Sequence, residues 1–235
     1  LIVERFGPQM VPVAGRGDER VDLRIYRIDP WHRGFWPFPA RPVHTDDAER
    51  PPGPGEEPLA PSAFSTPPDE ALVAEHIRTL GSPLVSVLHQ LPLSSGGPGG
   101  RFGLDLAPYF AKASGPAKPG TYLVGMRRLG AGSQREWIRV QVTDLSLTTV
   151  EEAEAVVFAV TSLATGRPVP GAKVKVEGLA GESPGGVHFE GVTGPEGTVR
   201  WVVPPKGVTS ITRLSASKDS DVVILDPRRP PDLLL

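Results

Sequence analysis

Ser183 is the side chain whose surroundings come nearest to a catalytic motif. It lies in the run GESPG at residues 181–185, which matches the G-x-S-x-G pattern of a hydrolase nucleophile. That motif needs a strand before the serine, a helix after it, and an oxyanion hole that uses the N–H of the next residue. Here the next residue is Pro184, which has no N–H, and residues 186–190 predict a strand. We therefore expect a loop at Ser183 and no enzyme activity; a hydrolase that uses Ser183 is the weaker alternative.

Two further patterns could bind a partner. Arg16-Gly17-Asp18 would sit at a hairpin tip, as an adhesive tripeptide does, but these are also ordinary turn residues. A cluster of four aromatic residues could bind a sugar or a peptide, although aromatic residues more often hold a long loop against the protein; the four are Trp31, Phe35, Trp36 and Phe38. We favour the turn and the packing interpretations.

Metal ligation is not indicated by the residue types or their spacing. The five histidines, His32, His44, His76, His89 and His188, form no H-x-x-x-H pair, and there is no cysteine to join them. We place His76 at the boundary of a helix's apolar face and His89 on the outer face of a strand. Asp219-Ser220-Asp221 could supply oxygens to Ca²⁺, which needs six or more, but a solvated hairpin turn is favoured. The sequence thus predicts no metal, no cofactor and no catalytic residue.

The composition bounds the possible functions. The 235 residues are 39% hydrophobic and 22% charged, with a formal net charge of −2, so the charge favours neither nucleic acid nor an anionic membrane. The absence of cysteine excludes disulfides, thiolate chemistry and a thioester within this chain. No apolar run approaches the length of a membrane span. Because the chain starts at Leu1, we expect a fragment or a processed chain.

The first part of the chain predicts a β-rich module with a long insertion. Residues 8–28 predict a hairpin, and strands are expected at 84–91, 119–126 and 137–142. Eleven prolines lie between Pro30 and Pro68, where no periodic pattern remains, and the acidic stretch 46–61 is expected to lack fixed structure. Thr66 predicts a helix N-cap, with an apolar face over residues 72–80 and a stop at Gly81. A second short helix is expected at 104–113.

The second part predicts a sandwich of short strands separated by turns. The expected strands are 155–163, 172–177, 187–192, 198–203, 211–215 and 221–225. We therefore divide the chain into a β-sandwich module at 1–144 with an insertion at about 29–82, a second module at 145–226, and a linker at 227–235. The fold class is mostly β, with tandem antiparallel sandwich modules of the macroglobulin or Ig-like kind and one or two short helices.

Several runs carry a family resemblance. They are VTDLSL at 142–147, VTSLATGRPVPGA at 160–172, TGPEG at 193–197, PGTYLV at 119–124, GPQMVPV at 7–13 and DLRIYRIDP at 22–30. Together they resemble macroglobulin-like modules from the N-terminal part of the bacterial alpha-2-macroglobulin family. Only the module fold and a scaffold role carry over, because no matched run is a chemical motif.

The resemblance implies a structural fragment of a large, protease-trapping envelope protein. Its partners would be the other modules of the same parent chain and, through the parent, proteases; its location would be periplasmic, cell-envelope or extracellular in a bacterium. Any thioester would lie outside this chain or be missing altogether. The alternative from a different class is an Ig-like adhesion or carbohydrate-binding module.

Overall fold

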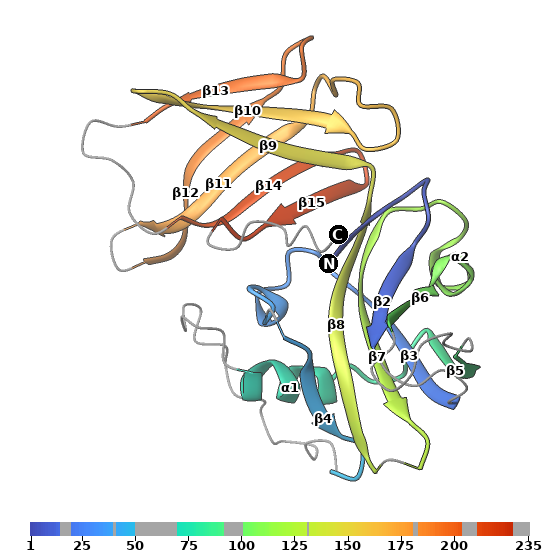
Figure 1. Cartoon of the computed structure of the whole chain (residues 1–235). Helices are drawn as coiled ribbons and strands as arrows, with labels where there is room; N and C mark the ends of the chain where they lie inside the picture. Colours follow the sequence, from blue (N-terminus) through green and yellow to red (C-terminus); the bar gives the residue numbers. More distant parts are fainter. Residues whose placement is uncertain are drawn as a thin grey trace. The chain divides into compact units, whose positions relative to one another are not determined.

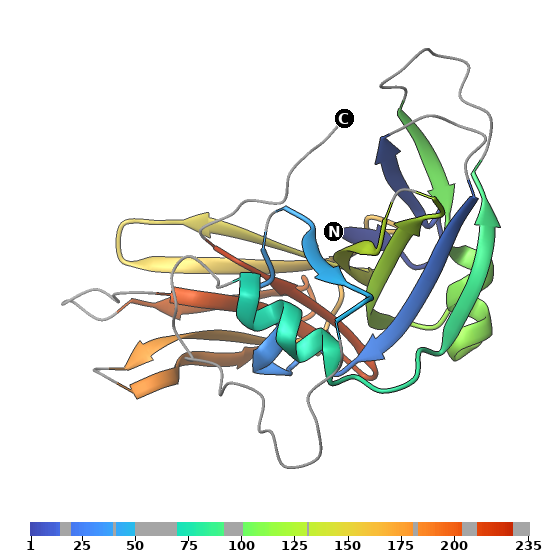
Figure 2. The same cartoon turned by 90° about the horizontal axis from the view of Figure 1, so that it is seen from below.

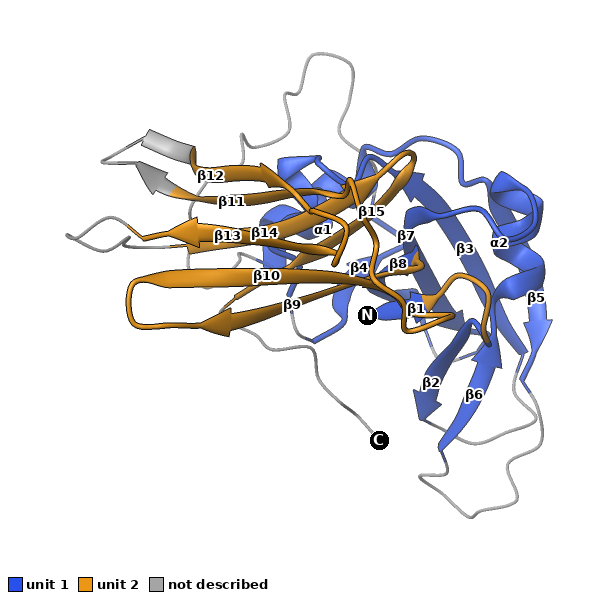
Figure 3. Ribbon diagram, turned by 90° about the horizontal axis from the view of Figure 1, so that it is seen from above, with its two compact units in different colours: residues 1–3, 8–142 blue, residues 4–7, 143–235 orange. Residues whose placement is uncertain are grey.

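Strands make up most of the secondary structure and fall into two units (Figures 1 and 3). The computed structural model describes residues 1–14, 20–39, 41–49, 70–91, 101–130, 132–180, 183–203 and 211–227. Unit 1 contains Leu1–Val3 and Pro8–Val142, and unit 2 contains Glu4–Gly7 and Thr143–Leu235. The predicted fold class, mostly β with tandem antiparallel modules and one or two short helices, is confirmed, and the described residues include two α-helices.

Unit 1 is built on a six-stranded sheet in the order β1-β8-β7-β3-β5, with β4 also paired to β8. The pairs among β3, β4, β5, β7 and β8 are antiparallel, and Leu23 of β3 lies between Val87 and Met126. Successive side chains of a strand point to opposite faces, so the long central strands supply residues to two layers. The strands are β1 (Ile2–Glu4), β3 (Arg20–Ile28), β4 (Val43–Asp46), β5 (Val85–Gln90), β7 (Gly120–Arg128) and β8 (Gln134–Thr143).

One face of this sheet is apolar and holds the main core of unit 1. Val21, Leu23 and Ile25 of β3 are fully buried there, as their alternation with polar residues predicts. A two-stranded ribbon of β2 (Met10–Ala14) and β6 (Arg101–Asp105) and the helix α2 (Ala107–Ser114) contribute to the same core. Within it the ring of Phe110 stacks on that of Tyr122, with 4.5 Å between centroids.

The insertion covers the opposite face of the sheet. The 3₁₀ turn η1 (Arg33–Phe35), β4 and the helix α1 (Glu70–Arg78) bury apolar side chains against Leu123 and Trp137. In Figure 2, α1 and α2 lie on opposite sides of the sheet. α1 is followed by Gly81, whose φ of 69° suits glycine at the predicted stop. Among the described residues, no helix is both long and apolar enough to cross a membrane.

Unit 2 is a sandwich of two sheets, ordered β13-β10-β9 and β12-β11-β14-β15 (Figures 1 and 2). Phe158 and Trp201 are buried in it, and the ring of Phe189 stacks against both at centroid distances of 5.8 and 5.7 Å. The strands are β9 (Leu145–Glu151), β10 (Ala155–Ser162), β11 (Lys173–Ala180), β12 (Ser183–Val192), β13 (Thr198–Val202), β14 (Ile211–Lys218) and β15 (Asp221–Leu225). All six strands predicted for this part are present, whereas β9 was not predicted.

The division into units differs from the predicted domains in two respects. Glu4–Gly7 belongs to unit 2, and the chain passes into unit 2 at Thr143. The prediction assigned residues 1–144 to a single module. The predicted linker at 227–235 lies, after Pro227, outside the described residues.

The predicted hairpin over residues 8–28 is wrong. β2 pairs with β6, where Val11 lies opposite Leu104, while β3 pairs with β5 and β7. The sequence shows that Val11 and Val13 need an apolar partner but not which strand supplies it. β3 is long and central, and strands from distant parts of the chain occupy both its edges. The expected turn at 15–18 lies outside the described residues.

The first residues of the stretch 46–61 are more ordered than its composition suggests. The stretch 46–61 was predicted to lack fixed structure, but Asp46–Glu49 form a turn in which the Asp46 carbonyl accepts from the Glu49 N–H at 3.1 Å. Residues 50–69 lie outside the described ranges, including the N-cap predicted at Thr66. The helix predicted at 104–113 begins instead at Ala107, because Leu104 belongs to β6.

Candidate functional site: a charge cluster under the insertion

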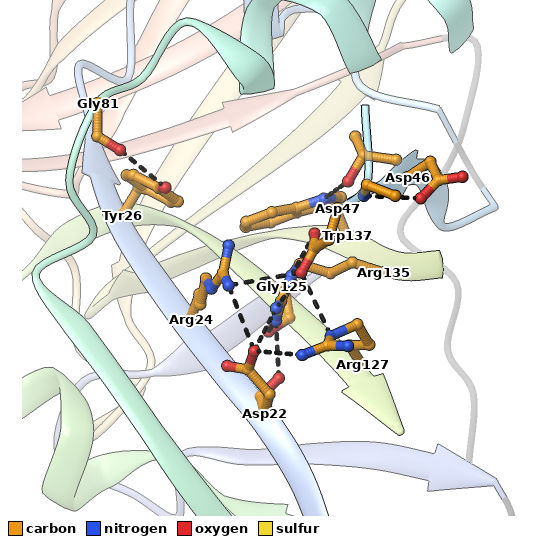
Figure 4. A network of polar contacts seen from close by, with 12 residues as sticks. Asp22, Arg24, Tyr26, Asp46, Asp47, Gly81, Gly125, Arg127, Arg135 and Trp137 are labelled. Atoms are coloured by element: carbon orange, nitrogen blue, oxygen red, sulfur yellow. Dashed lines mark hydrogen bonds and ion pairs between the residues drawn. The ribbon is translucent and has the colours of Figure 1, made fainter. Parts of the chain in front are cut away.

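Five charged side chains meet on the sheet face that the insertion covers (Figure 4). Asp22 and Arg24 come from β3, Arg127 from β7 and Arg135 from β8, and Asp47 directly follows β4. One Arg135 nitrogen lies 2.6 Å from the Asp22 carboxylate and 2.7 Å from that of Asp47. Arg24 and Arg127 lie 3.3–3.5 Å from the same two carboxylates. Three guanidinium groups therefore share two carboxylates.

Arg135 is the centre of this cluster and has no exposed side-chain surface. Besides the carboxylates, it donates to the backbone carbonyls of Asp22 at 2.7 Å and Gly125 at 3.3 Å. The planar guanidinium can make these contacts together because its N–H groups point in fixed, diverging directions. Burial would lower the pKa of Arg135, but the hydrogen bonds and charges of Asp47 and Asp22 hold it above its ordinary value.

The pKa of Asp22 shows what the cluster does to its carboxylates. Burial raises that pKa, but the hydrogen bond and charge of Arg135, together with Arg24 and Arg127, outweigh burial and bring it below its ordinary value. A general acid or base needs a pKa near the working pH, so Asp22 is tuned away from that role. The cluster instead binds the insertion, through Asp47, to three strands of the sheet.

Trp137 continues the same face beyond the charged groups. Its indole N–H donates to the hydroxyl of Thr45 on β4 at 2.7 Å, which is a second polar tie between the insertion and the sheet. Its ring lies against Gly125, where any Cβ would overlap the ring atoms. Glycine is therefore required here for close approach. Tyr26 stands 5.7 Å from the Trp137 ring and donates to the Gly81 carbonyl just after α1.

The loop expected at Ser183 is wrong, because Ser183 begins a strand and pairs with Ala180 of β11. β11 precedes it and β12 begins at Ser183, so the predicted strand at 186–190 is confirmed. A nucleophile elbow would need a helix in place of β12. Gly181, Glu182 and the Arg16-Gly17-Asp18 tripeptide lie outside the described residues.

The aromatic cluster and two histidines lie in unit 1. Phe35 and Phe38 belong to the second core, the apolar cluster between the insertion and the sheet around Leu123 and Trp137, as the packing interpretation predicts. The guanidinium of Arg139 stands 5.1 Å from the Trp36 ring. His76 is buried on α1, with its ring 6.3 Å from that of His32. In the described part of the chain, no three metal-ligating side chains come together.

The placement predicted for His89 is wrong. It shares a strand face with the buried Val85 and the half-buried Val87, whereas Leu88 is exposed. The His89 Nδ1 lies 2.5 Å from the hydroxyl of Tyr109 on α2. Leu88 is thus apolar but exposed, and His89 is polar but faces the protein interior, the reverse of the usual alternation. Hydrophobicity alone therefore indicated the wrong face of the strand for His89.

Asp221 is also not in a solvated turn. Its neighbour Asp219 is exposed with a φ of 54°, but Asp221 is buried and accepts the hydroxyl of Thr143 at 2.6 Å and the N–H of Asp144 at 3.0 Å. The carboxylate is occupied by donors from unit 2 itself.

Comparison with known proteins gives a match in structure only. No protein-family model and no curated protein matches the chain in sequence. A structure of native alpha-2-macroglobulin from Escherichia coli spanning domains NIE-MG1 aligns with a TM-score of 0.64 and 14% identity, over 97% of this chain and 92% of that one. The fold is alpha-2-macroglobulin-like. The resemblance seen in the sequence is thereby confirmed at the level of fold.

Longer structures also align with the chain over part of their own length. The E. coli protein spanning domains MG0-NIE-MG1 aligns with a TM-score of 0.60 and 14% identity, over 95% of this chain and 59% of that one. The trypsin-activated E. coli protein aligns with a TM-score of 0.59 and 14% identity, over 97% of this chain and 13% of that one. The chain therefore spans little more than half of the three-domain structure and about an eighth of the trypsin-activated one.

Sequence reasoning missed the charge cluster. Asp22 and Arg24 alternate with apolar residues in β3, which predicts a solvent-facing side. A signal was present in β8, where Arg135, Trp137 and Arg139 share one face. A tryptophan among arginines indicates a face that needs a cover.

Proposed function

We propose that this chain is a two-module scaffold segment of a bacterial, protease-trapping protein of the alpha-2-macroglobulin kind. The observation that carries the proposal is the match to a two-domain structure over nearly the full length of both chains. A chance likeness of one β-sandwich would not cover 97% of a chain that has two units.

We assign the units in the order of the domain names of that structure. Unit 1 then corresponds to NIE and unit 2 to MG1. Their role is mechanical: each presents a fixed surface to other modules of the parent chain, and the parent acts on proteases. On the same resemblance, we propose a location in the periplasm, the cell envelope or outside the bacterial cell.

The segment itself is proposed not to be an enzyme. Pro184 removes the N–H that an oxyanion hole would take from the residue after Ser183, and β12 stands where the motif needs a helix. The purified chain should show no esterase or peptidase turnover, and Ser183→Ala should leave its background rate unchanged. A turnover that Ser183→Ala abolishes would show that the chain is a hydrolase.

The trapping proposal is tested on the parent protein with trypsin and two substrates. Steric enclosure should protect a large protein substrate while a small chromogenic peptide is still cleaved. An active-site inhibitor of trypsin, which blocks both, is the control for enclosure. The isolated chain should block neither substrate, because a two-module segment cannot surround a protease. If the parent also blocks neither, the likeness is one of fold alone and an adhesion role becomes the better explanation.

Two variants of the parent protein test whether this segment contributes to trapping. Arg135→Met, which disrupts the charge cluster, should weaken trapping by the parent, whereas Arg128→Met on the exposed end of β7 should not. Equal trapping by both variants would mean that unit 1 is dispensable for the activity.

A further inference from the structure

The chain passes into unit 2 twice, and one carboxylate contacts both of the segments that lead into it. The first is Glu4–Gly7, a short excursion between two stretches of unit 1, and the second begins at Thr143. The two segments meet directly, because the N–H of Arg5 donates to the carbonyl of Thr143 at 2.9 Å. Asp221, at the start of β15, faces both: its Oδ2 lies 3.7 Å from the Arg5 guanidinium.

Asp221 has a donor on each carboxylate oxygen. Oδ1 accepts the hydroxyl of Thr143 at 2.6 Å, and Oδ2 accepts the N–H of Asp144 at 3.0 Å. The Thr143 hydroxyl, fully buried, also accepts the N–H of Leu145 at 3.0 Å. These bonds run in one direction, from backbone N–H through the hydroxyl to the carboxylate. Only an acceptor at position 221 completes them, and an ionised carboxylate is the strongest acceptor available.

Asp144 is held from its other side as well. Its carbonyl accepts the N–H of Leu163 at 2.7 Å, and its side chain accepts the N–H of Ala164 at 2.9 Å. Asp144 is thus bonded to the β14–β15 hairpin through its N–H and to the turn after β10 through its oxygens. A flexible linker would leave these groups to water.

We propose that Asp221 is a clamp that holds the two incoming segments, Glu4–Gly7 and Thr143–Leu145, in a single arrangement within unit 2. Asp221 is a positioning residue: it fixes the course of the chain where it passes into unit 2, through Thr143, Asp144 and Arg5. The proposal goes beyond the scaffold function, since it concerns the course of two chain segments within unit 2. It holds whatever the parent protein does.

Amide-resolved hydrogen exchange of the full chain tests the clamp, because it measures the protection of each amide in the two incoming segments separately. Asp221→Asn should accelerate exchange at Asp144 by roughly tenfold to hundredfold, the range that follows from losing a hydrogen bond to a charged group. Exchange at Leu145 and Arg5 should also rise, but by less, because their N–H groups bond to Thr143 and not to the carboxylate. Amides of β3 and β7 in unit 1 should exchange as before. The matched control is Asp219→Asn, the same substitution at the exposed tip of the same hairpin, where asparagine suits a positive φ.

Thr143→Val is the second variant and keeps the test usable if Asp221→Asn fails to fold. It removes the hydroxyl relay at nearly constant volume, so exchange should rise most at Leu145. The combined variant should accelerate Leu145 by less than the product of the two single effects, because both remove the same chain of bonds. The proposal is overturned if Asp221→Asn and Asp219→Asn give equal exchange at the three amides. It is equally overturned by a uniform acceleration across unit 2, which would make Asp221 a general stabiliser and not a clamp.

Discussion

Replacing Arg135 by methionine should destabilise unit 1 more than the same replacement of any exposed arginine. The substitution keeps a long side chain in place but removes the donors that bind two carboxylates and two carbonyls. Removing one partner of a buried ion pair costs about 3–5 kcal/mol, because the other charge stays buried. Arg24 and Arg127 still lie 3.3–3.5 Å from the carboxylates, so we expect the lower end, about 3 kcal/mol.

Urea unfolding followed by tryptophan fluorescence measures this cost. Trp31, Trp36 and Trp137 lie in unit 1 and Trp201 in unit 2, so the signal reports mainly on unit 1. Arg128→Met is the control and should change the free energy of unfolding by no more than about 0.5 kcal/mol, since Arg128 is exposed. Arg135→Lys should fall between the two, because lysine keeps the charge but not the diverging N–H groups.

Equal stability of Arg135→Met and Arg128→Met would contradict this prediction. If Arg135→Lys were as stable as the wild type, the charge alone would suffice and the directional N–H groups would not be needed. In the double variant Asp22→Asn with Arg135→Met the cost should be smaller than the sum of the single costs, since the second change removes the charge that the first leaves unpaired.

Three further predictions concern the same unit. The pKa of Asp22 is below its ordinary value of 3.8 in the folded chain, so its stabilising effect is present above that value and is lost as the pH falls; Asp22→Asn should flatten the acid limb of a stability–pH curve. Burial and the charge of His32 lower the pKa of His76 below 6.5 in the folded chain. The unfolded chain therefore binds the proton more readily, and the stability falls as the pH drops below 6.5. In His76→Phe this loss should disappear, so the urea midpoints measured at about pH 5 and about pH 8 should move closer together. Gly125→Ala should lower the free energy of unfolding by about 1–3 kcal/mol, because its Cβ overlaps the Trp137 ring. Gly103→Ala is the control: its Cβ comes close only to the end of the exposed Met10 side chain, so the loss in urea unfolding should be much smaller.

The sequence predicted individual strands better than their partners. β3, β10 and β15 could be found because alternation or a valine-rich run is a local signal. The pairing of β2 with β6 could not, because Val11 and Leu104 lie far apart in the chain and nothing local distinguishes β6 from another short strand. His89 was misplaced for a related reason: the Tyr109 hydroxyl that offsets its burial comes from another element.

The charge cluster was hidden by a different effect. Asp22, Arg24 and Arg127 resemble solvent-facing residues in their own strands, and only the fold places Asp47 against them. A proline-rich, acidic segment indicates disorder when its composition is considered alone. Its described residues, Asp46–Glu49, are held by contacts such as that of Asp47 with Arg135 on the sheet, which composition does not describe.

Those contacts also explain why the insertion needs a polar network in addition to apolar packing. The second core takes Ile28, Leu123 and Trp137 from the sheet, so the insertion depends on the sheet for its burial. Apolar burial is non-directional and would tolerate several positions of β4. The guanidinium of Arg135 is directional: it satisfies Asp22 and Asp47 together in one arrangement. Since a buried ion pair adds little net stability over an apolar replacement, we expect its main effect to be specificity, a single position of the insertion on the sheet. The scaffold role proposed above would require a fixed surface of this kind.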